Sequence, residues 1–362
     1  MSSPWEQLPR AEDCCPPHQG GICLRTGQIC RKALLALTLL GTLAGCGAPS
    51  GSSSSGDSEG DLILLTIGTA DSGGTMYPAG RAIAQVINSS DLDVELNVSA
   101  SQGSAPNIRS LRSGDIDLGL VSGDAAYAAV NGLGDFEPEP FQELRVIAAI
   151  YPSLSNWMAR SSSGLSYVHD LYGKRIGVGP QNSSTETSAA LVLSSMGITP
   201  ENSIFINAGL GSGAKEVQEG TLDVIYGFAG IPINGLADLA ASAPCVLLQY
   251  TQEELENILE ENPFYYQEII PAGTYENQTK DIATFGAKCL LCVSADMDDE
   301  LVYKLTSALY SARESFKEYH PSMGFMEKDG FMYQQLPIQL HPGARRFYQD
   351  AGLLPHEQGF AN

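Results

Sequence analysis

The sequence predicts an α/β protein made of two similar units that face each other across a cleft. The first unit opens with LILLTIGTADSGGTMYPAGRAIAQVIN at 62–88, which is an apolar run, a short Gly/Ser/Thr loop and apolar residues at helical spacing. The stretch RIGVGPQNSSTETSAALVLSSM at 175–196 repeats that order. Backbone N–H groups of small-residue loops can approach an anion at the positive end of a helix dipole. The repetition therefore predicts two opposed anion cradles.

A second repeated pattern follows each of these stretches. LRSGDIDLGL at 111–120 is echoed by VQEGTLDVIY at 217–226. Both indicate a helix closed by glycine and then a short apolar strand that begins at an aspartate, Asp117 or Asp223. Because open α/β sheets bind ligands at the carboxyl edge of their strands, two such edges facing one another predict a binding cleft.

The remaining apolar runs predict how the two units are connected. Further strands are expected at 94–98, 116–121, 144–150 and 282–293, and further helices at 108–113, 125–131, 214–219 and 296–317. We expect the chain to cross between units near 150–156 and to return near 271–281. The first lobe would then comprise residues 62–153 and 281–362, and the second lobe residues 154–280.

The first 61 residues predict export rather than a folded domain. Arg31 and Lys32 precede an apolar run at 33–43 that is too short to span a membrane, so residues 1–45 are expected to be a signal peptide. Leu-Ala-Gly-Cys at 43–46 resembles the lipobox of bacterial lipoproteins, which implies a lipid on Cys46; a chance cysteine after an ordinary signal is the alternative. Residues 46–61 are predicted to form a flexible linker. The long segment before Arg31 suggests a misassigned translation start.

The acidic composition excludes some classes of partner. A net charge of −22 repels nucleic acid and anionic surfaces, so we expect no nucleic-acid partner and a monomer. Salt screens surface carboxylates within about 8 Å, so an anion in a cleft responds mainly to local N–H groups.

The cysteines predict no redox or metal site. Cys289 and Cys292 have redox-motif spacing, but they lie in the apolar run at 282–293. In a buried strand, residues three positions apart point to opposite faces of the sheet, so these two cysteines would not meet at one site. This favours cysteines that serve as small buried side chains over a redox or metal role. We therefore expect no metal and no cofactor. Whether Cys245 forms a disulfide is left open.

Two polar or aromatic positions beside strand ends have alternative roles. Ser122, with Gly123 and Asp124, is expected to begin a helix, and Ser122 is also expected to contact the ligand. Asp124 would cap the helix or, alternatively, contact a ligand. Phe228 follows a strand at the predicted cleft edge, where it would cover a bound molecule or else belong to the core.

Several separated segments resemble one transport family. They are TIGTADSGGTMYPAG, ASQGSAPNIRSLRSGDIDLGLVSGDAAYAAVNG, VGPQNSSTET, NPFYYQEIIPAGTY and LPIQLHPGARRFY. In this order, over 62–354, they are similar to the TAXI solute receptors of TRAP transporters. The resemblance implies a two-lobed periplasmic binding protein of type II, each lobe a mixed sheet flanked by helices. Such a receptor is extracytoplasmic, closes on a small carboxylate such as glutamate or a C4/C5 dicarboxylate, and delivers it to a membrane permease.

The resemblance also implies the ligand-binding residues. They are Ser72, Gly73, Gly74, Thr75 and Tyr77 in the first lobe, Gln102 and Ser104 behind them, and Asn182, Ser183, Ser184 and Thr185 in the second lobe. One departure is the second-lobe loop, Asn-Ser-Ser-Thr, where relatives often carry Gly-Ser-Gly-Thr. The lost glycine freedom alters how the backbone approaches a ligand, so the resemblance leaves the solute open.

Catalysis is the alternative to binding. The five histidines are scattered without metal-ligand spacing, and the Gly/Ser loops lack a Gly-x-Ser-x-Gly nucleophile elbow. A hydrolase or transferase that uses Ser72 or Ser183 would need a general base from elsewhere in the fold. A surface adhesin with a vestigial cleft is a third reading. We therefore predict a binding protein without enzymatic activity.

Overall fold

The computed structural model describes residues 62–356. The predicted signal peptide at 1–45, the lipidation of Cys46 and the linker at 46–61 lie outside the described residues. Within the described part, no helix is both long and apolar enough to cross a bilayer.

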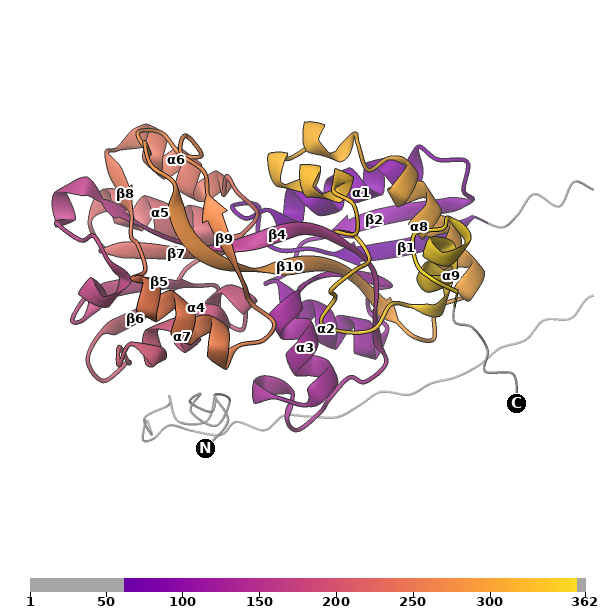
Figure 1. Cartoon of the computed structure of the whole chain (residues 1–362), viewed down its shortest axis with the longest axis horizontal. Helices are drawn as coiled ribbons and strands as arrows, with labels where there is room; N and C mark the ends of the chain where they lie inside the picture. The colour runs from indigo at the N-terminus through magenta and orange to yellow at the C-terminus, as the bar shows by residue number, and fades with distance from the viewer. Residues whose placement is uncertain (1–61, 357–362) are drawn as a thin grey trace, which may run out of the picture. The chain divides into compact units, whose positions relative to one another are not determined.

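The described chain forms one mixed ten-stranded sheet (Figure 1). Its strands are β1 (Ile63–Gly68), β2 (Val94–Ser99), β3 (Leu118–Ser122), β4 (Leu144–Arg160), β5 (Arg175–Gly179), β6 (Ile204–Asn207), β7 (Val224–Ala229), β8 (Cys245–Leu247), β9 (Tyr266–Ile270) and β10 (Ile282–Ser294). The order is β2-β1-β3-β10-β4-β7-β5-β6, with β8 beside β4 and β9 beside β10.

The sheet consists of two halves with the same internal order. In each half, three parallel strands are followed by one long antiparallel strand: β2-β1-β3 by β10, and β6-β5-β7 by β4. The two long strands also pair with each other, from Gly286 opposite Leu154 to Ser294 opposite Leu144. This two-part topology confirms the predicted α/β fold class.

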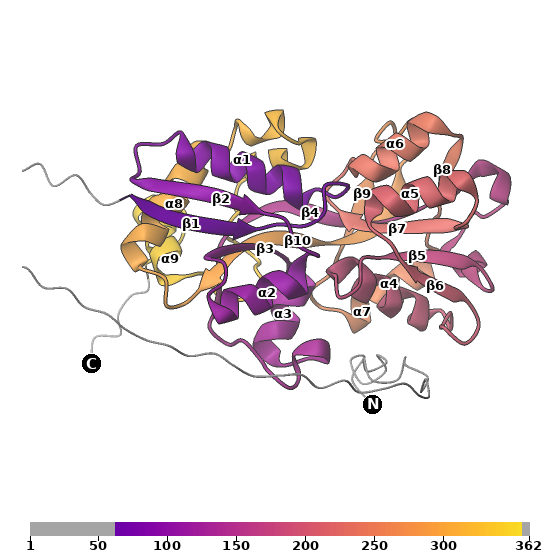
Figure 2. The same cartoon turned by 180° about the vertical axis from the view of Figure 1, so that it is seen from behind.

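Helices flank both halves of the sheet. They are α1 (Met76–Asn88), α2 (Ser104–Ser113), α3 (Gly123–Asn131), α4 (Ser184–Ser195), α5 (Leu210–Glu219), α6 (Asn234–Ser242), α7 (Gln252–Glu261), α8 (Asp299–Ser311) and α9 (Pro342–Asp350), with a short 3-10 helix η6 (Pro321–Glu327). Seen from behind, α1 and α2/α3 lie on opposite sides of β1–β3, and α5/α6 and α4/α7 on opposite sides of β5–β7 (Figure 2). The repeated strand-loop-helix pattern therefore builds two similar three-layer halves.

Each half buries its own apolar core. One cluster joins residues between 65 and 151 to residues between 289 and 348. Two further clusters contain only residues between 154 and 287. Along β10, Ala287 belongs to the second half and Cys289 to the first. The chain thus returns within β10, whereas the segment 271–281, which we expected to make the crossing, packs in the second half through Tyr275.

The repeated aspartates have the same structural role in both halves. Asp117 accepts a hydrogen bond from Thr66 N–H at 2.8 Å, and Asp223 accepts one from Arg175 N–H at 2.8 Å. Each aspartate also donates its own N–H to the carbonyl of that partner. A carboxylate at the start of β3 or β7 therefore fixes the register of the neighbouring strand, β1 or β5.

Removing one of these carboxylates should destabilise its half. We expect Asp117→Ala to lower the free energy of unfolding by about 1–3 kcal/mol, because the partly buried Thr66 N–H loses its charged acceptor. Urea unfolding measures this change. The exposed neighbour Asp115, whose carboxylate binds only the Ser113 hydroxyl, is the control, and Asp115→Ala should change stability by no more than about 0.5 kcal/mol. Equal losses in both variants would contradict the proposed role of Asp117.

Several element boundaries differ from the sequence expectations. The strand expected at 144–150 continues to Arg160, because β4 keeps pairing with β7 after it leaves β10. The helix expected at 108–113 begins at Ser104, since Pro106 falls in its first turn, where no helical N–H partner is lost. The helix expected at 296–317 is limited to Asp299–Ser311. Cys289 and Cys292 are buried as predicted, and all three described cysteines are free.

Candidate functional site

Most of the predicted ligand loops meet at one cavity between the two halves. The cavity has a volume of about 40 Å³ and is lined from the first half by the start of α1 and from the second half by the start of α4. Of the predicted site residues, it is lined by Gly74, Thr75, Gln102, Ser183, Ser184, Thr185 and Phe228. Residues more than a hundred positions apart are thus brought together at two helix N-termini, where backbone N–H groups have no helical acceptor.

Three direct contacts join the halves around this cavity. Thr75 Oγ1 donates a buried hydrogen bond to Gly230 O at 2.6 Å. Gly235 N–H donates to Gly73 O at 3.1 Å. The hydroxyls of Ser104 and Ser184 lie 2.9 Å apart. The predicted site residues therefore also hold the two halves together.

Other predicted site residues lie beside the cavity rather than along its wall. Ser72 and Asn182 are exposed, and Tyr77 is partly buried in the first turn of α1. Ser104 does not line the cavity, but its hydroxyl contacts that of Ser184, which does. The Ser104 hydroxyl also accepts a hydrogen bond from Ser122 N–H at 3.0 Å. Their roles in binding a ligand stay predictions.

Some of the expected N–H donors already have acceptors within the chain. Gly73 N–H donates to the Asp71 carboxylate at 2.7 Å, and Gly74 N–H donates to the Asp71 carbonyl at 3.3 Å. Asn182, in the left-handed region with φ of 61°, donates its N–H to the Glu186 carboxylate at 2.5 Å. Local carboxylates stabilise these turns, so the donors nearest an incoming anion are those of Thr75, Ser184 and Thr185 rather than of the glycines.

Eight of the lining residues were not predicted from the sequence. Asp71 and Leu210 line the cavity from the two halves, and Tyr151 of β4 lines it between them. The Tyr151 hydroxyl is fully buried and has no hydrogen-bond partner within 62–356. Burial, together with the Cys289 thiol nearby, holds the pKa of Tyr151 well above its usual value, so the hydroxyl keeps its proton. Tyr151 lies within the crossing expected near 150–156, but its position beside both loops depends on strand pairing.

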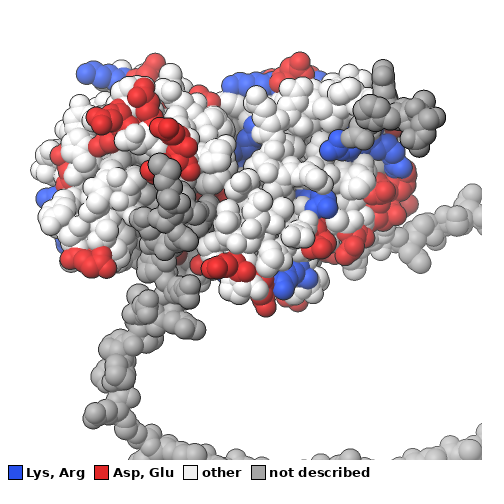
Figure 3. Space-filling view, turned by 60° about the horizontal axis from the view of Figure 1, so that its bottom comes forward, with Lys and Arg blue, Asp and Glu red and all other residues white. Residues whose placement is uncertain are grey.

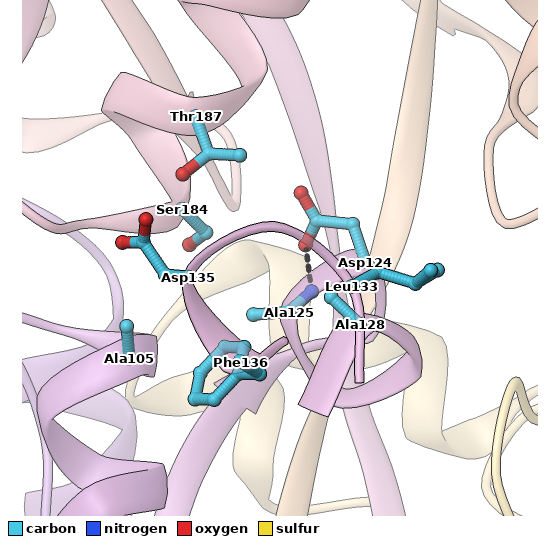
Figure 4. A pocket seen from close by; sticks show the side chains of 9 residues that line it. All are labelled: Ala105, Asp124, Ala125, Ala128, Leu133, Asp135, Phe136, Ser184 and Thr187. Atoms are coloured by element: carbon cyan, nitrogen blue, oxygen red, sulfur yellow. Dashed lines mark hydrogen bonds between the residues drawn. The ribbon is translucent and has the colours of Figure 1, made fainter. Parts of the chain in front are cut away.

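A second cavity of about 40 Å³ shares Ser184 with the first (Figure 4). Figure 4 shows the side chains of Asp124, Asp135, Ser184 and Thr187 around one space. Asp124 is buried, accepting hydrogen bonds from Ala125 N–H at 2.8 Å and from the Tyr265 hydroxyl at 3.2 Å. Because Tyr265 belongs to the second half, this carboxylate also connects the halves.

Burial raises the pKa of Asp124 above its usual value of 3.8, although hydrogen bonds oppose the shift. The native state therefore holds this proton more tightly than the unfolded chain, so stability falls as pH rises from 3.8 through the native pKa. We expect Asp124→Asn to remove this loss, so that the variant gains in unfolding free energy over the wild type as the pH rises. Urea unfolding at several pH values measures the difference.

The control for this prediction is Asp135→Asn, which removes an exposed carboxyl from the same cavity. If the unfolding free energies of Asp124→Asn and the wild type run parallel across the pH range, the buried carboxyl is not the cause.

The described residues hold no group of three His, Cys, Asp or Glu side chains that would bind a metal ion.

This chain is similar to a protein family and to several solved structures. Residues 67–352 match the profile of the NMT1-like family. A solved structure from Bordetella bronchiseptica RB50 is similar at 14% identity, covers 81% of this chain and 99% of its own, and has a TM-score of 0.52. The alkanesulfonate-binding protein from Xanthomonas axonopodis pv. citri, bound to MOPS, is 15% identical. The match covers 80% of this chain and 84% of that protein, with a TM-score of 0.47. A putative L-cystine ABC transporter from Listeria monocytogenes is 13% identical. The match covers 73% of this chain and 97% of that protein, with a TM-score of 0.45.

Proposed function

Because this chain belongs to the NMT1-like family, we propose that it is the extracytoplasmic solute receptor of a TRAP transporter, of the TAXI type. It would capture a small carboxylate, glutamate or a C4/C5 dicarboxylate, between its halves and deliver it to the membrane permease. The observation that supports this most strongly is the cavity formed jointly by the starts of α1 and α4.

The chemistry of the cavity supports a carboxylate rather than a cation. Thr75, Ser183, Ser184 and Thr185 supply hydroxyls, and the helix starts supply N–H groups. Neither Lys nor Arg is among the residues lining this cavity, and the carboxylate of Asp71, which does line it, accepts the Gly73 N–H. A carboxylate would therefore be bound by neutral donors and helix dipoles, each charge-assisted bond contributing about 1.5–3 kcal/mol.

The size of the cavity requires the halves to move. Sites for small molecules are usually about 300–1,000 Å³, whereas this cavity is about 40 Å³. We propose that the two halves act as lobes that open at the β4 and β10 crossings and close on the solute. Only a solute that contacts both lobes shifts this equilibrium, because its affinity differs between the two forms.

The predicted signal peptide at 1–45 and Cys46 after it indicate where the protein would act and which partners it would meet. We propose cleavage before Cys46, a lipid on that cysteine and a monomeric receptor tethered outside the cytoplasm. Acidic side chains gather in several groups on the face shown in Figure 3, and the net charge is −22. Such a surface does not favour nucleic acid.

The test is native mass spectrometry of the purified protein, followed by calorimetric titration with L-glutamate, succinate and 2-oxoglutarate. We expect one of these to bind with a stoichiometry of one and to be recovered chemically intact. Binding by none of them, with a different class of molecule co-purifying, would overturn the carboxylate proposal. Consumption of the solute would instead indicate an enzyme.

A further inference from the structure

A larger pocket lies apart from the cleft cavity and shares no lining residue with it. It has a volume of about 650 Å³. One wall is formed by residues 263–268, which lead into β9 and include its start. The other is formed by residues 325–337, which include the end of η6 and the chain after it; Lys288 of β10 also lines the pocket. In Figure 1 the chain after η6 passes across β10 on the side where β9 lies.

Lys288 is the distinctive group in this pocket. Its Nζ donates hydrogen bonds to Phe331 O at 3.0 Å and Gln334 O at 2.8 Å. It lies 4.8 Å from the centre of the Phe331 ring. No carboxylate within residues 62–356 forms an ion pair with it. Because an ammonium group has three donors, one N–H remains for a ligand.

The rest of the pocket wall suits an apolar body. The rings of Phe264, Tyr266, Phe325 and Phe331 line it. Its volume falls within the range of about 300–1,000 Å³ that is usual for small-molecule sites, which combine apolar walls with a few placed polar groups. Lys328 also lines the pocket, with its Nζ 3.4 Å from the centre of the Phe325 ring. The carboxylates of Glu268 and Asp329 line it too and would repel a second negative charge. The lining therefore favours an anion with one carboxylate over a dicarboxylate.

We propose that this pocket is a second binding site, which takes a small aromatic monocarboxylate whose carboxylate accepts the remaining N–H of Lys288. The site is independent of the solute cleft in its residues and in its ligand class. Desolvation lowers the pKa of Lys288 to about 8, so its ammonium group in the free site loses its charge in moderately alkaline solution. Affinity for the anion should fall as the pH rises through that value.

The test is calorimetric titration of the full-length protein with phenylacetate, using phenylacetamide as the uncharged probe of the same shape. We expect saturable phenylacetate binding that weakens about tenfold or more in Lys288→Met and for phenylacetamide. Lys288→Arg should keep the binding and lose its decline between about pH 7 and pH 9.5, because a guanidinium stays charged. The exposed Lys215 on α5 is the matched control, and Lys215→Met should bind as the wild type does.

Three outcomes would overturn the proposal: no saturable binding, equal binding of the amide probe, or unchanged affinity in Lys288→Met. Loss of phenylacetate binding in Thr75→Val, a cleft variant, would also overturn it, because the probe would then occupy the cleft. If Lys288→Met does not fold, as judged by thermal unfolding, Tyr266→Glu replaces it. This change places a negative charge in the wall and should abolish phenylacetate binding.

Discussion

Replacing Gly73 by valine should prevent the halves from closing while leaving each half folded. A Cβ at Gly73 would lie 2.5 Å from Gly211 N in the second half, closer than any real contact allows. Overpacking of this kind costs about 1–3 kcal/mol, and here the molecule can relieve it by separating the halves. We expect solute affinity to fall by about tenfold to a hundredfold. Calorimetry measures the affinity, and small-angle scattering should show a larger radius of gyration.

Gly211, which lies opposite Gly73 in this contact, supplies the control. A Cβ at Gly211 would meet only the Gly73 Cα at 3.9 Å, which is an ordinary van der Waals contact. Gly211→Ala should therefore bind the solute and scatter as the wild type does. If Gly73→Val keeps full affinity and an unchanged radius of gyration, this close approach has no part in closure.

Replacing Thr75 by valine should weaken solute binding by about tenfold or more, because closure loses a buried hydrogen bond. Thr75 Oγ1 is the donor to Gly230 O at 2.6 Å, and valine would leave that carbonyl buried without its partner. The same change removes a hydroxyl from the cavity wall. The loss is measured by calorimetry with the solute that co-purifies.

Thr75→Ser keeps the hydroxyl and is the matched control, with affinity close to that of the wild type. A fall of the same size in the serine variant would attribute the effect to the lost methyl group rather than to the bond. Unchanged affinity in Thr75→Val would remove this residue from the proposed site.

Local pattern was sufficient to find the two loops. Apolar runs followed by Gly, Ser and Thr residues and then by helical spacing identified the starts of α1 and α4, and seven of the suggested residues line one cavity. The repeated Asp117 and Asp223 proved equivalent in their bonds to the backbone of the neighbouring strand. These features are local, because a strand, a turn and a helix start depend mainly on neighbouring residues.

Pairing and crossing were harder to predict. The sequence gives no sign that β4 continues past Pro152, because what extends it is a change of partner from β10 to β7. The return crossing was expected at 271–281, yet it lies within β10, where packing changes from one core to the other. Tyr151 was missed for the same reason, since only strand pairing places it at the cavity.

Residue order alone determined that this chain has two α/β units, each with a hydroxyl-bearing loop at a helix start. Only the tertiary structure decided that the loops meet, that local carboxylates occupy the Gly73 and Asn182 N–H groups, and that Thr75 and Ser184 connect the halves. The physical reason is range: turns and caps depend on a few adjacent residues, whereas contacts between 75 and 230 or between 104 and 184 depend on how the whole sheet packs.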